Sequence, residues 1–115
     1  MFDILIVEDN VKLRQRIKSI LTSKLPFIVV AEASDGKEAL SEIEKNRPDL
    51  VIMDIQLTAE NGLALTKRIK RRYPCIPIAI NTNSDSPEYQ TAADKVGAEY
   101  FLSKEATKPS EIVEL

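Results

Sequence analysis

The sequence predicts a single α/β domain in which helices cover both faces of a five-stranded parallel sheet. Short apolar runs recur along its 115 residues, and each is followed by a segment whose apolar positions have the period of a helix. Two of the runs end abruptly in carboxylates, as expected of strands that lead to one functional edge. Because alternating strands and helices favour right-handed crossovers, the expected architecture is a doubly wound, three-layer α/β/α sandwich.

The composition is that of one soluble globular domain. Hydrophobic residues make up 43% of the chain and charged residues 30%, a balance typical of folded domains. The net charge of -2 argues against direct nucleic-acid binding by this domain. The chain opens without a basic and apolar signal, and no apolar run approaches the roughly 20 residues of a membrane span. We therefore expect a cytoplasmic protein that does not contact membranes.

The chain has no histidine and one cysteine. Sites that depend on histidine, such as a Ser-His-Asp triad or a His-ligated metal, are therefore excluded. Cys75 cannot form an intramolecular disulfide, and its place between Pro74 and Pro77 predicts a loop that leads into a strand. Without a histidine to activate the thiol, a small apolar filler is the favoured role, and a reactive thiol is the alternative.

Five strands and five helices are expected to alternate along the chain. The expected strands cover residues 2–8, 27–31, 50–53, 77–80 and 100–102. The expected helices begin near Asn10, Asp35, Gly62, Ser86 and Thr107. Pro26 ends the first helix, Gly97 ends the fourth, and the fifth is cut off at Leu115.

Local signals support these boundaries. Asp35 and Glu38 have the spacing of a capping box, and Ser86-Pro87-Glu88 combines a capping side chain, a proline at the first helical position and an acid in the first turn. Gly62 is expected to relieve the backbone where the third helix begins. The apolar residues expected on buried helix faces are Leu13, Ile17, Ile20, Leu21 and Leu25, then Ala39, Leu40 and Ile43, then Leu65, Ile69 and Tyr73.

Two groups of polar residues admit more than one interpretation. One is a basic run toward the end of the third helix, made of Lys67, Arg68, Lys70, Arg71 and Arg72. It suggests phosphate or nucleic-acid binding, but a solvated face that complements the negative helix terminus is favoured. The other is a set of residues on the fourth helix that we expect to be exposed, as a partner surface or, as favoured, a plain solvated face: Tyr89, Gln90 and Lys95.

The carboxyl ends of the parallel strands bring polar residues to one edge of the sheet: Glu8, Asp9, Asp54, Thr82 and Lys104. Taken singly, each acid is explained as a turn or cap residue, Thr82 as a loop hydroxyl and Lys104 as a surface charge. Taken together, three carboxylates repel one another unless a cation joins them. Oxygen ligands with room for water and phosphate oxygens favour Mg²⁺.

Such a site can take a phosphoryl group. Asp54 is a possible nucleophile, since Lys104 and the metal would neutralise phosphoryl oxygens while Thr82 donates a hydrogen bond. The product would be an aspartyl phosphate. Its negative charge and acceptor oxygens would pull Thr82 and its loop toward the site.

In this order, the site residues resemble the receiver domain of two-component response regulators, and the resemblance covers the whole chain, residues 1–115. The stretch from Ile4 to Asn10 is similar to the family's first strand and acidic pair. Asp54, with Gly62 eight residues later, is similar to the phosphoacceptor strand and its loop. The family's switch hydroxyl, switch aromatic residue and phosphate-binding lysine match Thr82, Phe101 and Lys104. The fold this implies is flavodoxin-like, (βα)5.

The resemblance also implies roles for these residues. Mg²⁺ would be bound by Glu8, Asp9, Asp54 and the backbone carbonyl of Gln56. Asp54 would accept a phosphoryl group from a sensor histidine kinase or a phosphotransfer protein. Thr82 and Phe101 would then signal a change of shape in the face formed by the fourth helix, fifth strand and fifth helix, through which a homodimer is possible.

The chain departs from the family pattern in three places, which involve four residues. Leu57-Thr58 stands where Met-Pro is usual, Asn83 stands where a small residue follows the hydroxyl, and Glu105 stands where proline or aspartate is common. None of these changes removes a chemical group that the reaction needs. Asn83 is bulkier beside the phosphate, so we expect it to affect rates and not the class of reaction.

Two other functions stay open. A flavin or nucleotide enzyme on the same fold would need an anion-binding loop after the first strand, where Glu8-Asp9-Asn10 would repel a phosphate. A pseudo-receiver that only binds a partner would not need the complete set of site residues. We expect a signalling domain that assists its own phosphorylation and dephosphorylation and is not otherwise an enzyme.

The expected last helix is short, because it is cut off at Leu115. Our hypothesis is therefore that the chain has been trimmed from a longer protein. The missing part would be an effector, such as a DNA-binding helix-turn-helix domain that controls transcription.

Overall fold

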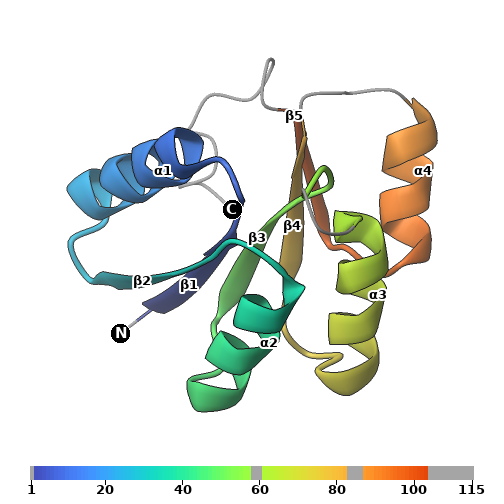
Figure 1. Ribbon diagram of the computed structural model, residues 1–115, viewed down its shortest axis with the longest axis horizontal. Helices are drawn as coiled ribbons and strands as arrows, with labels where there is room; N and C mark the ends of the chain where they lie inside the picture. Colours follow the sequence, from blue (N-terminus) through green and yellow to red (C-terminus); the bar gives the residue numbers. More distant parts are fainter. Residues whose placement is uncertain (1, 58–60, 83–86, 104–115) are drawn as a thin grey trace.

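The computed structural model describes residues 2–57, 61–82 and 87–103, which form five strands and four helices (Figure 1). The strands are β1 (Phe2–Val7), β2 (Ile28–Ala33), β3 (Leu50–Asp54), β4 (Ile78–Thr82) and β5 (Tyr100–Ser103). The helices are α1 (Val11–Lys24), α2 (Gly36–Lys45), α3 (Gly62–Arg72) and α4 (Pro87–Lys95). The predicted fifth helix and the predicted cap at Ser86 lie outside the described residues.

The five strands form one parallel sheet in the order β2-β1-β3-β4-β5. Helix α1 lies on one face, and α2, α3 and α4 lie on the other (Figure 1). The predicted three-layer architecture is therefore confirmed. In this order β1 and β3 are neighbours at the centre of the sheet, so the residues that follow them meet at the same edge.

Two apolar layers hold the helices to the sheet, because alternate strand residues point to opposite faces. Ile4 and Ile6 of β1 pack with Ile17 and Leu21 of α1. The larger layer on the other face includes Leu5 and Val7 from β1, Ile43 from α2, Leu65 and Ile69 from α3 and Ala93 from α4. Every residue of β3 is buried, as its continuous apolar run predicts.

Side-chain caps set the starts of α1 and α2. Asn10 accepts a hydrogen bond from the Leu13 N–H through its side-chain oxygen at 3.1 Å. The predicted cap at Asp35 is confirmed, since its Oδ1 accepts from the Glu38 N–H at 2.8 Å. Glu38 in turn accepts from the backbone N–H of Ser34, one residue before the position that a capping box would use.

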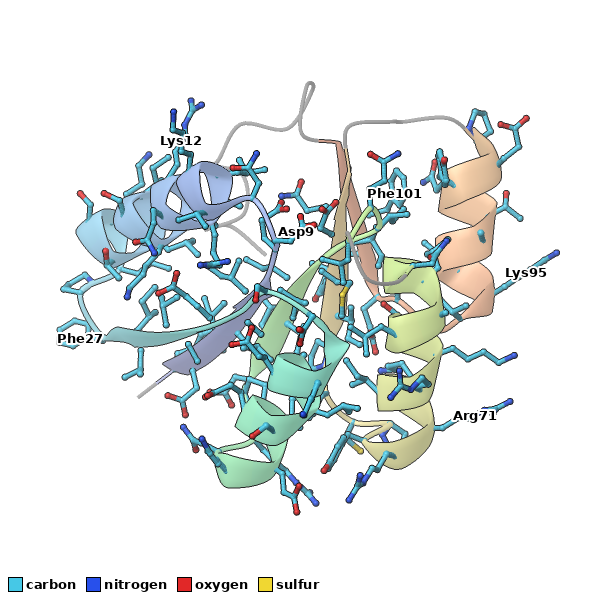
Figure 2. All side chains as sticks on the ribbon, viewed as in Figure 1. Asp9, Lys12, Phe27, Arg71, Lys95 and Phe101 are labelled. Carbon is cyan, nitrogen blue, oxygen red and sulfur yellow. The ribbon has the colours of Figure 1, made fainter. Side chains whose placement is uncertain are left out.

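Two strands end two residues later than the sequence predicts, and the ends of the other three strands lie within one residue of the prediction. β2 begins one residue later than expected and extends to Ala33, and β4 extends to Thr82. The reason is pairing with neighbours, since Val7 of β1 pairs with Ala33 and Asp54 of β3 pairs with Asn81. Phe27 stays outside β2 with 82% of its surface exposed, at the rim of the molecule (Figure 2).

Three predictions about side-chain environment are wrong. Cys75 is exposed, so it is not an apolar filler. Tyr89 of α4 is half-buried and packs against the larger apolar layer, whereas Gln90 and Lys95 are exposed. Lys70 leaves the solvated basic face of α3, because its side chain is only 13% exposed.

The Lys70 ammonium group instead ties together the chain at the amino edge of the sheet. It donates to the backbone carbonyls of Pro74 and Ile76 at 2.9 and 3.1 Å and pairs with Glu99 at 2.6 Å. Its four basic neighbours on α3 are exposed, as predicted: Lys67, Arg68, Arg71 and Arg72. Among the described residues, no helix has the length and apolar character that crossing a membrane requires.

Candidate functional site

Three carboxylates meet at the carboxyl edge of the sheet, as the sequence predicts. Glu8 and Asp9 follow β1, and Asp54 is the last residue of β3. Their ligand oxygens all lie within 4.8 Å of one another. The contact arises because β1 and β3 pair in register up to Val7 and Met53. Figure 2 shows Asp9 at this edge, between α1 and the sheet.

The acid cluster, defined as Glu8, Asp9 and Asp54, is only partly open to solvent. Glu8 is 2% exposed and Asp54 5%, whereas Asp9 is half-buried. Gathering three negative charges with so little water around them is unfavourable unless a cation shares the site. The donor set consists of carboxylate oxygens, which are the ligands that Mg²⁺ prefers. The residues present therefore fit a magnesium ion.

The acid cluster has two arms: the first is the segment Glu8-Asp9 after β1, and the second is Asp54 at the end of β3. Hydrogen bonds from backbone N–H groups fix both arms. The Glu8 N–H donates to the Ala33 carbonyl at 3.0 Å, and the Glu8 carboxylate accepts from the Asn10 N–H at 3.3 Å. On the other arm, Asp54 accepts from the Gln56 N–H at 3.2 Å. Gln56 also forms a bridge to Asn61, so the loop after β3 folds back on itself at its base.

Gly62 lets α3 begin directly against the phosphoacceptor candidate's backbone. A Cβ at this position would overlap the carbonyl oxygen of Asp54 and lie 2.8 Å from the Ile55 Cα. Gly62 has no positive φ, so the glycine relieves the backbone by leaving out a side chain and not by adopting a left-handed conformation. Its role is steric, since the Gly62 N–H donates to the Ile55 carbonyl at 2.7 Å and no side chain fits in that contact.

An open pocket of about 470 Å³ lies over the acid cluster. Asn10 and Gln56 also line it, and its lining continues along α1 with Lys12, Leu13 and Arg16. The sequence analysis did not predict that Lys12, Leu13 and Arg16 form one wall of the pocket. Its signal was the four-residue spacing of Lys12 and Arg16, which places both on one side of a helix. Whether that side of the helix faces the acid cluster depends on how α1 is rotated about its own axis, which the sequence alone does not determine.

Asn81 is a second residue that sequence reasoning missed. It pairs with Asp54 across β3 and β4 and is 6% exposed. Its signal was a polar residue directly after the apolar residues 78–80, in the place that Asp54 has after the apolar residues 50–53. Among the described residues, no buried side-chain nitrogen or oxygen lacks a hydrogen-bond partner.

The other predicted site residues are placed less fully. Thr82 is the last residue of β4 and pairs with Ser103 through the backbone. Phe101 of β5 pairs with Ile80, is half-buried, and packs against the larger apolar layer (Figure 2). Lys104, Thr58, Asn83 and Glu105 lie outside the described residues. The roles predicted for all these residues stay predictions.

A cluster of donors around Glu32 lies beside the acid cluster. Glu32 of β2 accepts from Arg14 Nε at 2.9 Å, from Gln15 Nε2 at 2.7 Å and from Lys18 Nζ at 3.1 Å. Burial raises the pKa of Glu32, but the hydrogen bonds and charges of Arg14 and Lys18 together outweigh it and hold that pKa below its ordinary value. Arg14 also donates through Nη1 to the Glu8 carbonyl at 2.7 Å.

Comparisons with known proteins agree with this geometry. A family model described as "Response regulator receiver domain" matches residues 4–115. The receiver domain of NtrX from Brucella abortus superposes with a TM-score of 0.88 at 31% identity, covering 97% of this chain and 92% of that one. Chemotaxis protein CheY4 from Vibrio cholerae superposes with a TM-score of 0.90 at 29% identity, covering 99% and 94%.

Curated relatives are longer proteins. The transcriptional regulatory protein DegU from Brevibacillus brevis is 35% identical over 102 residues, which are 89% of this chain and 43% of that protein. A protein-glutamate methylesterase/protein-glutamine glutaminase from Geobacillus kaustophilus is 33% identical over 103 residues, covering 88% and 29%. The chain thus spans less than half the length of these two relatives.

Proposed function

Because the chain belongs to the response regulator receiver domain family, we propose that it accepts a phosphoryl group on Asp54 in a reaction that depends on Mg²⁺. One observation carries this proposal. Asp54 ends the central strand β3 within 4.8 Å of two further carboxylates, under an open pocket. A nucleophile, a cation-binding donor set and room for a phosphorylated group therefore coincide at one point of the surface.

In the proposed reaction, a carboxylate oxygen of Asp54 attacks the phosphorus of a phosphohistidine on a sensor histidine kinase or a phosphotransfer protein. The new O–P bond gives an aspartyl phosphate, and the P–N bond breaks with its electron pair left on the imidazole. Glu8, Asp9, Asp54 and the backbone carbonyl of Gln56 would hold Mg²⁺. The ion would supply charge neutralisation for the phosphoryl oxygens.

The remaining residues would read the phosphorylated state. We propose that Lys104 neutralises a phosphoryl oxygen and that Thr82 donates a hydrogen bond to another. The Phe101 side chain would then change its conformation, which would alter the shape of the face that includes α4 and β5. That face is where a partner or a second copy of the chain would bind.

We propose that the output of this receiver comes from a further domain, as in a longer protein. DegU carries the name of a transcriptional regulatory protein and extends well beyond the matched region. By this likeness, we propose that the receiver controls transcription in the cytoplasm through an effector that binds DNA. The receiver itself would act as a signalling domain whose only chemistry is its own phosphorylation and dephosphorylation.

The test is the intact mass of the 115-residue chain after incubation with Mg²⁺ and acetyl phosphate, repeated with phosphoramidate, whose P–N bond imitates a phosphohistidine. We expect one phosphate adduct that requires Mg²⁺ and is absent in Asp54→Asn. Asp49→Asn is the matched control, because Asp49 lies just before β3, where it accepts from the Asp3 N–H at 2.8 Å. This control should form the adduct as the wild type does.

Two outcomes would contradict the proposal. An adduct that persists in Asp54→Asn would place the phosphoryl group elsewhere. No adduct from either donor, in a folded chain that still binds Mg²⁺, would favour a pseudo-receiver that acts only by binding a partner.

A further inference from the structure

One guanidinium group joins the acid cluster to the rest of the sheet. Arg14 lies in the first turn of α1, and its side chain is 14% exposed. It donates through Nη1 to the Glu8 carbonyl at 2.7 Å and through Nε to Glu32 at 2.9 Å. A single side chain therefore connects a helix, an edge strand and the peptide between Glu8 and Asp9.

That peptide is the part of the backbone that carries both acids of the first arm. Its carbonyl, that of Glu8, accepts from Arg14 at 2.7 Å. The preceding peptide is held as well, because the Glu8 N–H donates to the Ala33 carbonyl at 3.0 Å. Rotation of this peptide would move Asp9 relative to Asp54. The geometry of the donor set therefore depends on the hydrogen bond from Arg14.

Glu32 in turn fixes Arg14. It lies on β2 and accepts from three side chains of α1, those of Arg14, Gln15 and Lys18. The planar fork of the guanidinium allows Arg14 to reach a carbonyl and a carboxylate at once, which a lysine ammonium does with less directional control.

We propose that Arg14 and Glu32 form a positioning pair for the acid cluster, which sets the affinity of the cluster for Mg²⁺ without either residue contacting the ion. The proposal rests on the Mg²⁺ site of the proposed function. A role in positioning and a role through charge predict opposite changes in Mg²⁺ affinity when Arg14 is removed. If Arg14 acted only through its charge, removing it would strengthen cation binding at the nearby acids. If it acts by positioning, removing it weakens that binding.

The chain offers a matched control at the opposite edge of the sheet. Lys70 also donates to backbone carbonyls, those of Pro74 and Ile76, and also pairs with one glutamate, Glu99. Its loss should affect stability as the loss of Arg14 does. It lies at the amino edge, away from the acid cluster, so it should not affect Mg²⁺ binding.

The experiment is a Mg²⁺ titration of the chain, followed by amide chemical shifts in nuclear magnetic resonance, because the protein has no tryptophan for a fluorescence readout. The variants are Arg14→Met, Glu32→Gln, the double variant and Lys70→Met, with urea unfolding of each. We expect the dissociation constant for Mg²⁺ to rise about tenfold in Arg14→Met, an effect typical of residues that orient metal ligands. Glu32→Gln and the double variant should show a similar rise, and Lys70→Met should stay within about twofold of wild type.

The double variant separates geometry from charge, because it has the net charge of the wild type. The proposal is overturned if Arg14→Met, folded by its urea transition, binds Mg²⁺ as tightly as the wild type or more tightly. Acetyl phosphate labelling of the same wild-type sample keeps the two proposals distinguishable. Labelling with an unchanged Arg14→Met affinity would overturn the positioning role alone. Mg²⁺ binding without labelling, with the tenfold loss in Arg14→Met, would overturn the phosphoacceptor role alone.

Discussion

The two edges of the sheet use charge in opposite ways. At the carboxyl edge, Glu8, Asp9 and Asp54 bring three like charges within 4.8 Å. At the amino edge, Lys70 pairs with Glu99 at 2.6 Å, and Glu99 also accepts from the Ile78 N–H at 3.0 Å. Like charges held together cost stability, whereas opposite charges with complete hydrogen bonding contribute to it. The crowding of like charges therefore identifies the carboxyl edge as the place where the proposed cation would bind.

The largest expected difference between the two edges is in the stability lost when a glycine at each edge is replaced by alanine. Gly62→Ala should lower the free energy of unfolding by about 3 kcal/mol, because its Cβ would overlap the Asp54 carbonyl and the backbone of the site would have to move. Gly97→Ala should cost about 1 kcal/mol, because its φ of 93° strains an alanine, while the nearest atom, in the Lys70 side chain, is 3.5 Å away. Urea unfolding of both variants measures the difference.

The glycine pair also has a functional readout. Gly62→Ala should weaken Mg²⁺ binding as well as stability, since the displaced backbone belongs to a proposed ligand. Gly97→Ala should leave Mg²⁺ binding unchanged. Equal losses of stability in the two variants would contradict the steric role of Gly62.

Charge reversal on the helices is the next contrast. Arg16 lines the pocket over the acid cluster, whereas Arg71 points away from the sheet on α3 (Figure 2). Arg16→Glu should slow labelling by acetyl phosphate about tenfold at low salt, because a cationic wall raises the local concentration of an anionic donor. Arg71→Glu makes the same change of net charge and should have little effect.

Salt tests the origin of the Arg16 effect. The difference between Arg16→Glu and wild type should shrink as ionic strength rises and the Debye length falls. Equal slowing by Arg71→Glu would show that net charge, and not the pocket wall, controls the rate.

How far the sequence predicts this structure depends on the range of each interaction. The cap at Asp35 and the run that ends at Asp54 were predicted because their signals are local. The acid cluster was predicted because parallel strands bring their carboxyl ends together whatever the details of packing. The contacts of Arg14 and Lys70 were not predicted, because helical periodicity assigns a face to a side chain but not the distant carbonyl that it reaches.

The smallest expected effect is the pH dependence of stability that comes from the ion pairs of Glu32, which lie near the carboxyl edge. The pKa of Glu32 is held below its ordinary value in the folded state. Ionised Glu32 therefore stabilises the fold at pH values above the unfolded pKa of about 4.3, and this contribution is lost as the pH falls through the lower folded pKa. Its side chain is 23% exposed, so we expect at most about 1 kcal/mol. Urea unfolding from pH 7 to pH 3 should show the stability of wild type converging on that of Glu32→Gln. A difference that stayed constant over this range would mean that packing, and not the charge of Glu32, accounts for the effect of the substitution.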